Sequence, residues 1–419
     1  MAKIVLATIG SLGDMHPKIA LAIELKKRGH DVTIAAMEFY RERIEPLGIG
    51  FAPMAPHLDP NDGELARDLM DARKGSEKIL REIVMPNLRP MYDDLMCAIE
   101  HADLLVTGEI VFAVKSAVEK SGIKWVSTSL QPGTFFSTHD PFVPPTAEWL
   151  EYLRFLGPTF HSGLFSFLRW SISDWFAPYR DFRRSLGLNG DHDPLLGDKF
   201  SPLLHLAMFS KVLGAPQPDW PANTVQTGFC FYDGGNDIQK MPDGLHEFLD
   251  SGNPPVVFTL GSAAVMDARD FFEESGEAAR LLGRRAVLLF GKYSEPPKVL
   301  GGDIQGFDYA PYSEVFSRAA CVVHQGGVGT TGQVLRAGVP HLIVPFAHDQ
   351  PDNAARCRRL GVAEIISRSN YKALPASDAL SRILSDPLFG QRAAETAAIV
   401  RSEGGTETAC DAIERVLRF

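Results

Sequence analysis

The sequence contains few cysteines, and those it has lie far apart. Five cysteines occur among 419 residues, and no two of them form a CxxC pair. They are Cys97, Cys230, Cys321, Cys357 and Cys410. Scattered thiols in an odd number are typical neither of a disulfide framework nor of a zinc site. The first residues also lack the basic start and long apolar run of a secretory signal, so we expect a protein of the reducing cytoplasm.

An excess of positive charge is also missing. The 42 lysines and arginines are outnumbered by 52 acidic residues, which gives a formal net charge of -10. Because a nucleic-acid binder needs clustered basic residues, we expect a small-molecule partner and no nucleic acid. No apolar run approaches the roughly 18 residues that cross a bilayer, which argues against an integral membrane protein. The GxxxxGK loop of ATP and GTP hydrolases is missing as well.

Acidic pairs that could hold a metal ion are scarce. The one DxD sequence runs from Asp191 to Asp193, between glycine and proline residues. That setting is typical of a solvated turn. We therefore expect neither a metal nor another cofactor.

The length and the order of apolar segments indicate two α/β domains. A chain of 419 residues exceeds what one hydrophobic core usually supports. Residues 1–50 have the pattern strand, glycine-containing turn, helix, strand, and a second series of buried strands begins near residue 254. We expect a first domain at 1–235, a second domain at 236–400, and a last helix at 401–419 that packs back towards the first domain. Ligands of doubly wound sheets bind beyond the carboxyl ends of the strands.

The strongest motif begins at a buried strand, Cys321 to Val323, which is followed by HQGGVGTT. Its glycines let backbone N–H groups approach an anion, and a helix N-terminus attracts phosphate. Thr330 or Thr331 is expected to cap that helix, and His324 to donate a hydrogen bond or a positive charge to a diphosphate. A plain turn that needs glycine is the simpler alternative. A GxGxxG pattern at Gly327, Gly329 and Gly332 leaves a nicotinamide oxidoreductase open.

This motif resembles the donor box of the UDP-glycosyltransferases of GT-B fold. HQGGVGTT is similar to their His-Gly-Gly loop, HDQ to their terminal Asp-Gln pair, and YAPYSEVFSRAA to their Trp-Val-Pro-Gln segment. The resemblance implies two Rossmann-like doubly wound domains that face each other across a cleft, with an acceptor bound by residues 1–235 and a nucleotide-sugar donor bound by residues 236–400. It also implies an inverting, metal-independent hexosyltransferase. The donor-binding residues it implies are Ser262, Tyr309, Ala310, His324, Gly326, Gly327, Gly329, Thr330, Gln333, Asp349 and Gln350.

The implied roles differ along this set. Tyr309 would stack on the base, and Ala310 would offer backbone groups to the edge of the base. Asp349 and Gln350 would bind hydroxyls of the sugar. Gln333 stands where plant members have a ribose-binding Glu, which leaves the choice between UDP and dTDP open. The motifs GSLGDMHP near the start and AHDQPDNA near the end are most similar to those of bacterial glycolipid and rhamnosyl-type members.

The catalytic base is expected in the loop after the first strand, GSLGDMHP. Attack on the sugar needs a group that removes the acceptor proton, and Asp14 lies where family members have a base. His16 is the competing candidate, since its ordinary pKa suits a base. Alternatively, Asp14 only caps a helix that begins at Pro17.

Aromatic residues crowd the segment 149–182. We expect most of them to pack in the core and a minority to touch a lipophilic or aromatic acceptor, with possible contact to a membrane surface. Phe135, Phe136 and His348 are the candidate acceptor contacts. A sugar-nucleotide epimerase of the same fold and a protein that only binds nucleotides are the alternative functions.

Overall fold

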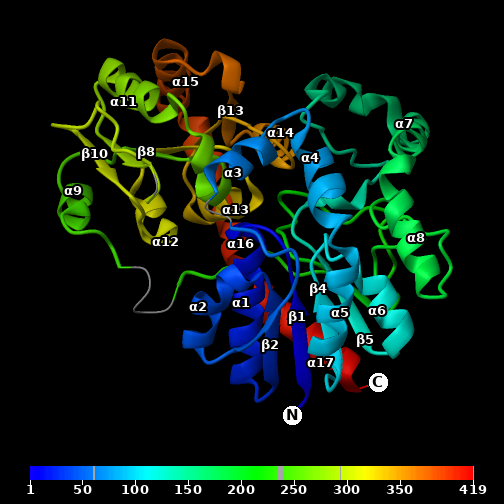
Figure 1. Ribbon diagram of the computed structural model, residues 1–419. Helices are drawn as coiled ribbons and strands as arrows, with labels where there is room; N and C mark the ends of the chain where they lie inside the picture. The colour runs from blue at the N-terminus through cyan, green and yellow to red at the C-terminus, as the bar shows by residue number, and fades with distance from the viewer. Residues whose placement is uncertain (60–61, 235–239, 293, 419) are drawn as a thin grey trace.

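The protein forms two α/β halves, each built on a parallel sheet (Figure 1). This computed structural model describes residues 1–59, 62–234, 240–292 and 294–418. The predicted boundary at residues 235 and 236 therefore lies outside the described residues. Two Rossmann-like domains were expected from the alternating pattern, and this fold class is confirmed. Within the described ranges, no helix is long and apolar enough to cross a membrane.

The first sheet has seven strands in the order β3-β2-β1-β4-β5-β6-β7. These strands are β1 (Lys3–Ala7), β2 (Asp31–Ala36), β3 (Gly50–Pro53), β4 (Leu104–Thr107), β5 (Lys124–Ser129), β6 (Leu204–Ala207) and β7 (Thr224–Gln226). Chain order reverses between β1 and β4, where Ala7 lies opposite Thr107. Loops that leave the two strands here diverge to opposite faces and create room for a ligand.

The second sheet has six strands in the order β10-β9-β8-β11-β12-β13. These strands are β8 (Val256–Thr259), β9 (Ala286–Leu289), β10 (Ile304–Phe307), β11 (Cys321–His324), β12 (His341–Ile343) and β13 (Ala363–Ile365). The reversal here lies between β8 and β11. The strands of both sheets have nearly continuous apolar sequences, because helices cover both faces of a parallel sheet.

Helices connect and cover the strands. In the first half the α-helices are α1 (Leu12–Lys27), α2 (Arg41–Ile44), α3 (Gly63–Leu69), α4 (Gly75–Lys78), α5 (Leu88–Ile99), α6 (Val114–Ser121), α7 (Gly157–Ser171) and α8 (Ala177–Ser185). In the second half they are α9 (Leu245–Asp250), α10 (Gly261–Ala264), α11 (Phe271–Leu282), α12 (Tyr312–Val315), α13 (Val328–Ala337), α14 (Gln350–Leu360), α15 (Ala373–Ser385), α16 (Pro387–Ser402) and α17 (Gly405–Arg418).

Shorter helical turns complete the chain. The 3-10 segments are η1 (Glu38–Tyr40), η2 (Glu45–Leu47), η4 (Pro132–Phe135), η5 (Glu148–Leu156), η6 (Ser173–Phe176), η7 (Val265–Asp267), η8 (Phe316–Arg318) and η9 (Arg368–Asn370). A π-helical segment, η3 (Ile79–Val84), follows α4 directly.

The first helix begins earlier than the sequence suggested. In the alternative interpretation Asp14 caps a helix that begins at Pro17, but α1 starts at Leu12 and Ser11 is its N-cap. The Ser11 side chain accepts from the Gly13 N–H (3.2 Å), and Asp14 accepts from the Ser11 N–H (2.8 Å). This reciprocal pair is a capping box, which places Asp14 in the first helical turn.

Apolar packing joins the two halves. One buried cluster combines Phe209 and Leu213 of the first half with Leu335, Ile343 and Cys357 of the second. The final helix, α17, packs on α1, and its apolar face completes the core beneath that helix. Figure 1 shows α17 running beneath the first sheet, close to both chain ends.

Candidate functional site

The predicted ligand loops of the two halves meet. A Cβ atom placed on Gly329, in the first turn of α13, would lie 3.9 Å from Cα of Gly13 in the first turn of α1. Each helix follows the strand at which its sheet reverses order. The N-termini of α1 and α13 therefore face each other at the place where both sheets open to a ligand.

Asp14 is held tightly at this meeting point. Gly10 has a φ of 127°, and a Cβ there would lie only 2.2 Å from Asp14 Oδ2. Burial raises the pKa of Asp14 to about 7, against the hydrogen bond from the Ser11 N–H, and the carboxylates of Glu109 and Asp349 raise it further. Taken as a whole residue, Asp14 is half-buried. It is thus a much stronger base than an ordinary carboxylate.

Glu109 is a second carboxylate that sequence reasoning missed. It follows β4 and accepts hydrogen bonds from the Leu130 N–H (2.9 Å) and the Thr134 hydroxyl (2.8 Å). Burial raises its pKa, although Lys199 and Lys18 oppose this. Its position directly after the strand that neighbours β1 was the available signal.

His16 is placed less favourably for the role of base. Burial lowers its pKa to about 4, and the positive charge of Arg43 lowers it further. Its ring packs edge-on against Tyr232, with centroids 5.3 Å apart. An imidazole with so low a pKa is a poor proton acceptor.

The buried position of His324 argues against its predicted role as a diphosphate contact. Its side chain is fully buried, its Nδ1 accepts from the Gly326 N–H (3.0 Å), and its Nε2 lies 3.1 Å from Nδ1 of His341. Burial lowers the pKa of His324 far below its ordinary value, and His341 adds to this shift. A neutral ring engaged at both nitrogens supports the glycine turn and offers no positive charge to a diphosphate.

The side chain of Gln325 lies close to two glycines of the second half. A Cβ on Gly261, at the end of β8, would lie 2.4 Å from Gln325 Nε2, and one on Gly327 would lie 2.8 Å from the same atom. The buried Gln325 Oε1 has no hydrogen-bond partner among the described residues. An amide at the reversal point of the second sheet is a candidate contact for a ligand.

The glycine loop provides a helix N-terminus, but with a different cap. We expected Thr330 or Thr331 to cap the helix, whereas α13 begins at Val328 with Gly327 as N-cap. Gly326 has a φ of 90°, and a Cβ there would lie 3.0 Å from the Gln350 carbonyl oxygen. The N–H groups of Gly329 and Thr330 belong to the first turn, where helix geometry supplies no carbonyl partner.

Asp349 and Gln350 stand at the start of α14. Asp349 Oδ2 accepts from the Val328 N–H (3.1 Å) and from Nδ2 of Asn353 (2.6 Å). Burial raises the pKa of Asp349 to about 6. Gln350 Oε1 accepts from the N–H groups of Phe346 (2.8 Å) and Ala347 (3.1 Å). The Gln350 oxygen therefore stabilises the loop that precedes α14.

Three other predicted donor contacts line the second half. Ser262 is exposed in α10, directly after β8. Tyr309 is 43% exposed after β10, and burial of its hydroxyl raises its pKa. Ala310 is fully buried and packs in the core, so only its backbone is available to a ligand.

Gln333 bonds to Asp233 of the first half and to Arg336 on its own helix. Its Nε2 donates to Asp233 (3.1 Å), and its Oε1 accepts from Arg336 (2.7 Å). Arg336 also binds both carboxylate oxygens of Asp233, at 2.9 and 2.6 Å. Asp233 is thus a carboxylate beside the predicted ribose-binding position, and sequence reasoning missed it because the contact spans about a hundred residues.

The predicted acceptor residues fall into two groups. Phe135 is buried and stacks on Trp220, with centroids 3.9 Å apart, which argues against its predicted acceptor contact. Phe136 has a φ of 48° and packs edge-on against Phe142, but keeps part of its ring exposed. His348 is also left-handed, with a φ of 57°, and its Nδ1 lies 3.1 Å from the Ser76 hydroxyl of the first half.

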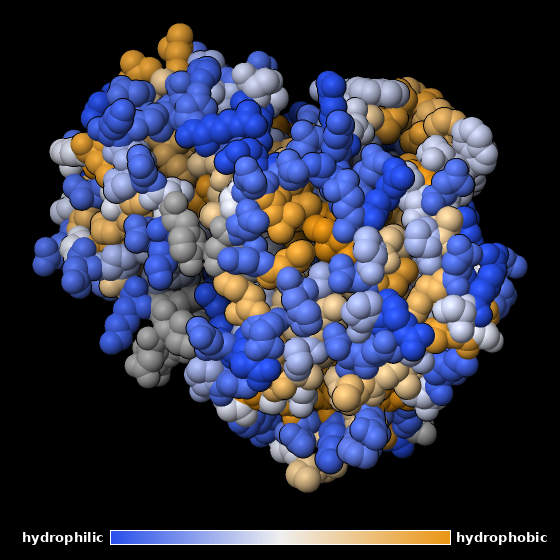
Figure 2. Space-filling view, viewed as in Figure 1, coloured by the Kyte–Doolittle hydropathy of each residue, from blue (hydrophilic) through white to orange (hydrophobic). Residues whose placement is uncertain are grey.

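The aromatic segment packs less than we expected. Phe176, Tyr179 and Phe182 are buried, but most large aromatics before them are exposed. The exposed ones are Trp149, Tyr152, Phe155, Phe160, Phe167 and Trp170. They belong to η5 and α7, and Figure 2 shows hydrophobic side chains over α7 at the upper right. Core packing of most of these aromatics is therefore wrong, because both elements run over the surface.

The described residues contain no group of three His, Cys, Asp or Glu side chains arranged for a metal ion. In the DxD sequence, Asp193 accepts from the N–H groups of Leu195 (3.0 Å) and Leu196 (2.9 Å). That carboxylate stabilises a turn. The five cysteines are free thiols.

Comparison with known proteins agrees with this arrangement. Residues 4–91 match the glycosyltransferase family 28 N-terminal domain, and residues 291–413 match the C-terminal domain described as erythromycin biosynthesis protein CIII-like. The O-mycaminosyltylonolide 6-deoxyallosyltransferase of Streptomyces fradiae is 34% identical, over 98% of this chain and 97% of that protein. The vancomycin aglycone glucosyltransferase of Amycolatopsis orientalis is 27% identical, over 99% of this chain and 98% of that protein.

A solved structure has the same fold. The glycosyltransferase VinC, in complex with dTDP, superimposes with a TM-score of 0.69 at 20% identity, over 99% of each chain. The identity shared with the Streptomyces fradiae enzyme extends over nearly the whole chain and includes both matched domains. The chain therefore belongs to the UDP-glycosyltransferase family of GT-B fold enzymes.

Proposed function

We propose that this glycosyltransferase moves a hexose from a dTDP-activated sugar to a hydroxyl group of a lipophilic natural product. The observation that carries the proposal is the meeting of α1 and α13, which brings Asp14 opposite a glycine-rich helix N-terminus. A base and an anion site on opposite sides of one gap are what displacement of a nucleotide diphosphate requires.

In the proposed reaction, the deprotonated Asp14 accepts the proton of the acceptor hydroxyl. The acceptor oxygen then forms a bond to the anomeric carbon while the bond to the diphosphate oxygen breaks, with inversion at that carbon. The N–H groups of Gly329 and Thr330 and the Gln325 amide would stabilise the charge that develops on the leaving phosphate. Asp349 and the Gln350 amide nitrogen would orient the sugar.

The preference for dTDP rests on Gln333. Its uncharged amide is already bonded to Asp233 and Arg336, so it does not offer a free carboxylate to two ribose hydroxyls. The VinC structure contains dTDP, and the Streptomyces fradiae relative is named for transfer of a 6-deoxyallosyl group. The VinC complex supports a thymidine-linked donor here, and the name of the relative supports a deoxyhexose as the sugar.

A donor and acceptor panel tests the function. The enzyme would be incubated with UDP-glucose, dTDP-glucose and dTDP-rhamnose, each with macrolide, phenol and sterol acceptors, and products would be identified by mass. We expect a glycoside from a dTDP-sugar and a lipophilic hydroxyl. A change of the donor without any acceptor would instead indicate an epimerase, an alternative that the transferase names of the relatives do not favour.

A further inference from the structure

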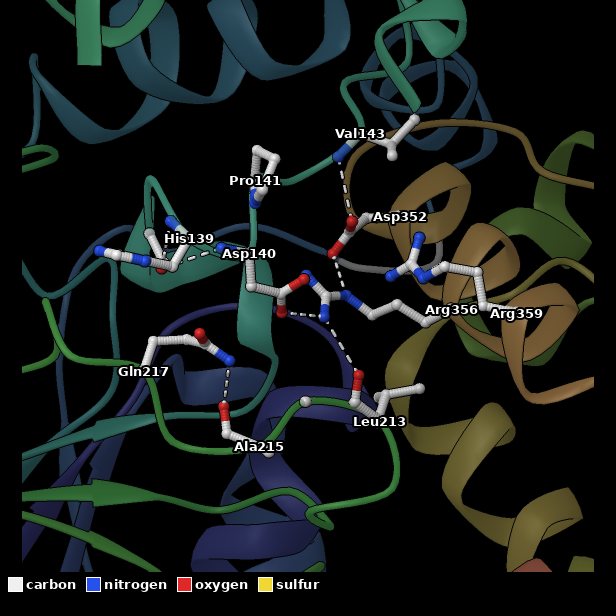
Figure 3. A network of polar contacts seen from close by, with 12 residues as sticks. His139, Asp140, Pro141, Val143, Leu213, Ala215, Gln217, Asp352, Arg356 and Arg359 are labelled. Atoms are coloured by element: carbon white, nitrogen blue, oxygen red, sulfur yellow. Dashed lines mark hydrogen bonds and ion pairs between the residues drawn. The ribbon is translucent and has the colours of Figure 1, made fainter. Parts of the chain in front are cut away.

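A buried ionic network ties the donor half to the acceptor half (Figure 3). At its centre is Arg356, on α14, whose side chain is 2% exposed. It contacts Asp352 on the same helix and Asp140 from the first half, and these carboxylates are 1% and 10% exposed. We call these three residues the Arg356 cluster.

Two nitrogens of the Arg356 guanidinium donate hydrogen bonds, and they bind different residues. Its Nε donates to Asp352 Oδ2 (2.8 Å), while one terminal nitrogen donates to Asp140 and to the Leu213 carbonyl (3.1 Å). Asp352 uses its other oxygen to accept from the Val143 N–H (3.0 Å). One helix of the donor half thus holds both ends of the segment 140–143 and a loop after β6.

Two glycines make this close approach possible. A Cβ on Gly214 would lie 2.6 Å from Cγ of Pro132 and 3.3 Å from a terminal nitrogen of Arg356. A Cβ on Gly133 would lie 3.2 Å from Asp352 Oδ2. The backbone of the first half is therefore fitted around the charged side chains of α14.

A buried ionic network is a less favourable way to join two surfaces than apolar packing. Burying charges costs free energy that apolar packing would not cost, and an apolar core already joins the halves nearby. Burial opposes ionisation of Asp140, but Arg356 and Arg154 outweigh it and hold the pKa of Asp140 below its ordinary value. What buried ion pairs do provide is fixed geometry, because hydrogen bonds of charged groups are directional.

The two elements joined here both lead to the site. α14 begins with the candidate sugar contacts Asp349 and Gln350, two turns before Arg356. Segment 140–143 follows Phe136, and its Phe142 ring packs on Phe136. We propose that Arg356 is a positioning residue. Together with Asp140 and Asp352, it fixes segment 140–143, beside the candidate acceptor contact Phe136, relative to the start of α14. This inference rests on the proposed function.

Conservative variants test the proposal. Arg356→Lys keeps the charge but cannot hold both carboxylates in one plane, and Asp140→Asn keeps the shape but removes the ion pair. The matched control is Arg359→Lys, since Arg359 on the same helix bonds Glu151 of the first half (2.6 Å) but is 32% exposed. We would measure sugar transfer and acceptor-free donor hydrolysis for the pair found in the panel, together with the Kd for dTDP.

We expect Arg356→Lys and Asp140→Asn to lower the ratio of transfer to hydrolysis by roughly 10-fold to 100-fold, because misplaced reactants react slowly. The Kd for dTDP should change less than about twofold, and Arg359→Lys should resemble the wild type. If Arg356→Lys does not fold, Asp140→Asn decides, since its amide oxygen still accepts from Arg356.

An unchanged ratio would overturn the proposal, as would a loss of dTDP binding in parallel with transfer, which indicates a general structural role. Failure of the wild type to transfer sugar to any acceptor is a different result. It would refute the proposed function and not the positioning role alone.

Discussion

The Asp14 carboxylate lies over Gly10, so close that a Cβ atom at Gly10 would lie only 2.2 Å from Oδ2. The absence of a side chain at Gly10 thus leaves room for the carboxylate to accept from the Ser11 N–H. This fixed orientation is the basis of the first two predictions.

Asp14→Asn should lower kcat by about 100-fold or more, because the amide cannot accept the acceptor proton. Binding of dTDP should persist, since Asp14 lies on the opposite half from the glycine-rich loop at residues 324–331. His16→Ala is the control and should have a much smaller effect. The opposite ranking of the two variants would show that His16 is the base.

The pH dependence should follow the pKa of Asp14, which is raised to about 7. Because a base acts in its deprotonated form, kcat/KM should rise with pH up to about 7 and then level off. A profile that is already flat at pH 5 would contradict this assignment.

Stability should change in the opposite direction. The folded protein binds the Asp14 proton more tightly than the unfolded chain between pH 3.8 and about 7, so this group's contribution to stability falls as pH rises through that window. Asp14→Asn should therefore raise the Tm relative to wild type at pH 8 and have little effect at pH 4. Thermal melts at both pH values measure this difference.

His324 and Gln325 should respond differently to substitution. His324→Ala removes the acceptor of the buried Gly326 N–H and should lower the free energy of unfolding by about 1–3 kcal/mol. Gln325→Ala removes an amide that lacks a protein partner for its oxygen, so it should weaken dTDP binding with little loss of stability. Urea unfolding and calorimetric titration with dTDP separate the two effects, and equal effects on both would refute the distinction.

Tyr309→Ala should raise the Kd for dTDP about tenfold, because base stacking on an exposed aromatic ring contributes about 1–3 kcal/mol. Tyr309→Phe keeps the ring and should bind like the wild type. If both variants bind equally, the base does not stack there.

Removal of metal ions should leave the reaction intact. In the proposed mechanism, helix N–H groups and an amide stabilise the charge on the leaving diphosphate. Dialysis against EDTA should therefore not lower kcat. Recovery of activity by added Mg²⁺ or Mn²⁺ after EDTA would contradict metal independence.

The sequence predicted the fold well, because continuous apolar runs separated by helix-length segments are typical of parallel sheets. It could not assign the side chains at the end of β11. Successive residues of a strand point to opposite faces, and both faces of this sheet are covered, so His324 and Gln325 could not be distinguished by hydropathy. The start of α1 was missed for a local reason, since the Ser11 and Asp14 capping box lies within the glycine-containing loop.

Long-range contacts were also beyond the sequence pattern. Phe135 and Phe136 are neighbours of the same type, yet one stacks in the core on Trp220 and the other turns outwards through a left-handed backbone. The bond from Gln333 to Asp233 depends on how the two halves dock. The edge strand β3 was not predicted because it is short and only partly buried.

The apolar cluster that contains Phe209, Leu213, Leu335, Ile343 and Cys357 also determines how the molecule should unfold. The side chains of this cluster are buried by contacts between the two halves. Each half alone would expose its part of the cluster to solvent. The halves should therefore melt as one cooperative unit, with a single calorimetric peak. Either half produced separately should expose this surface and aggregate.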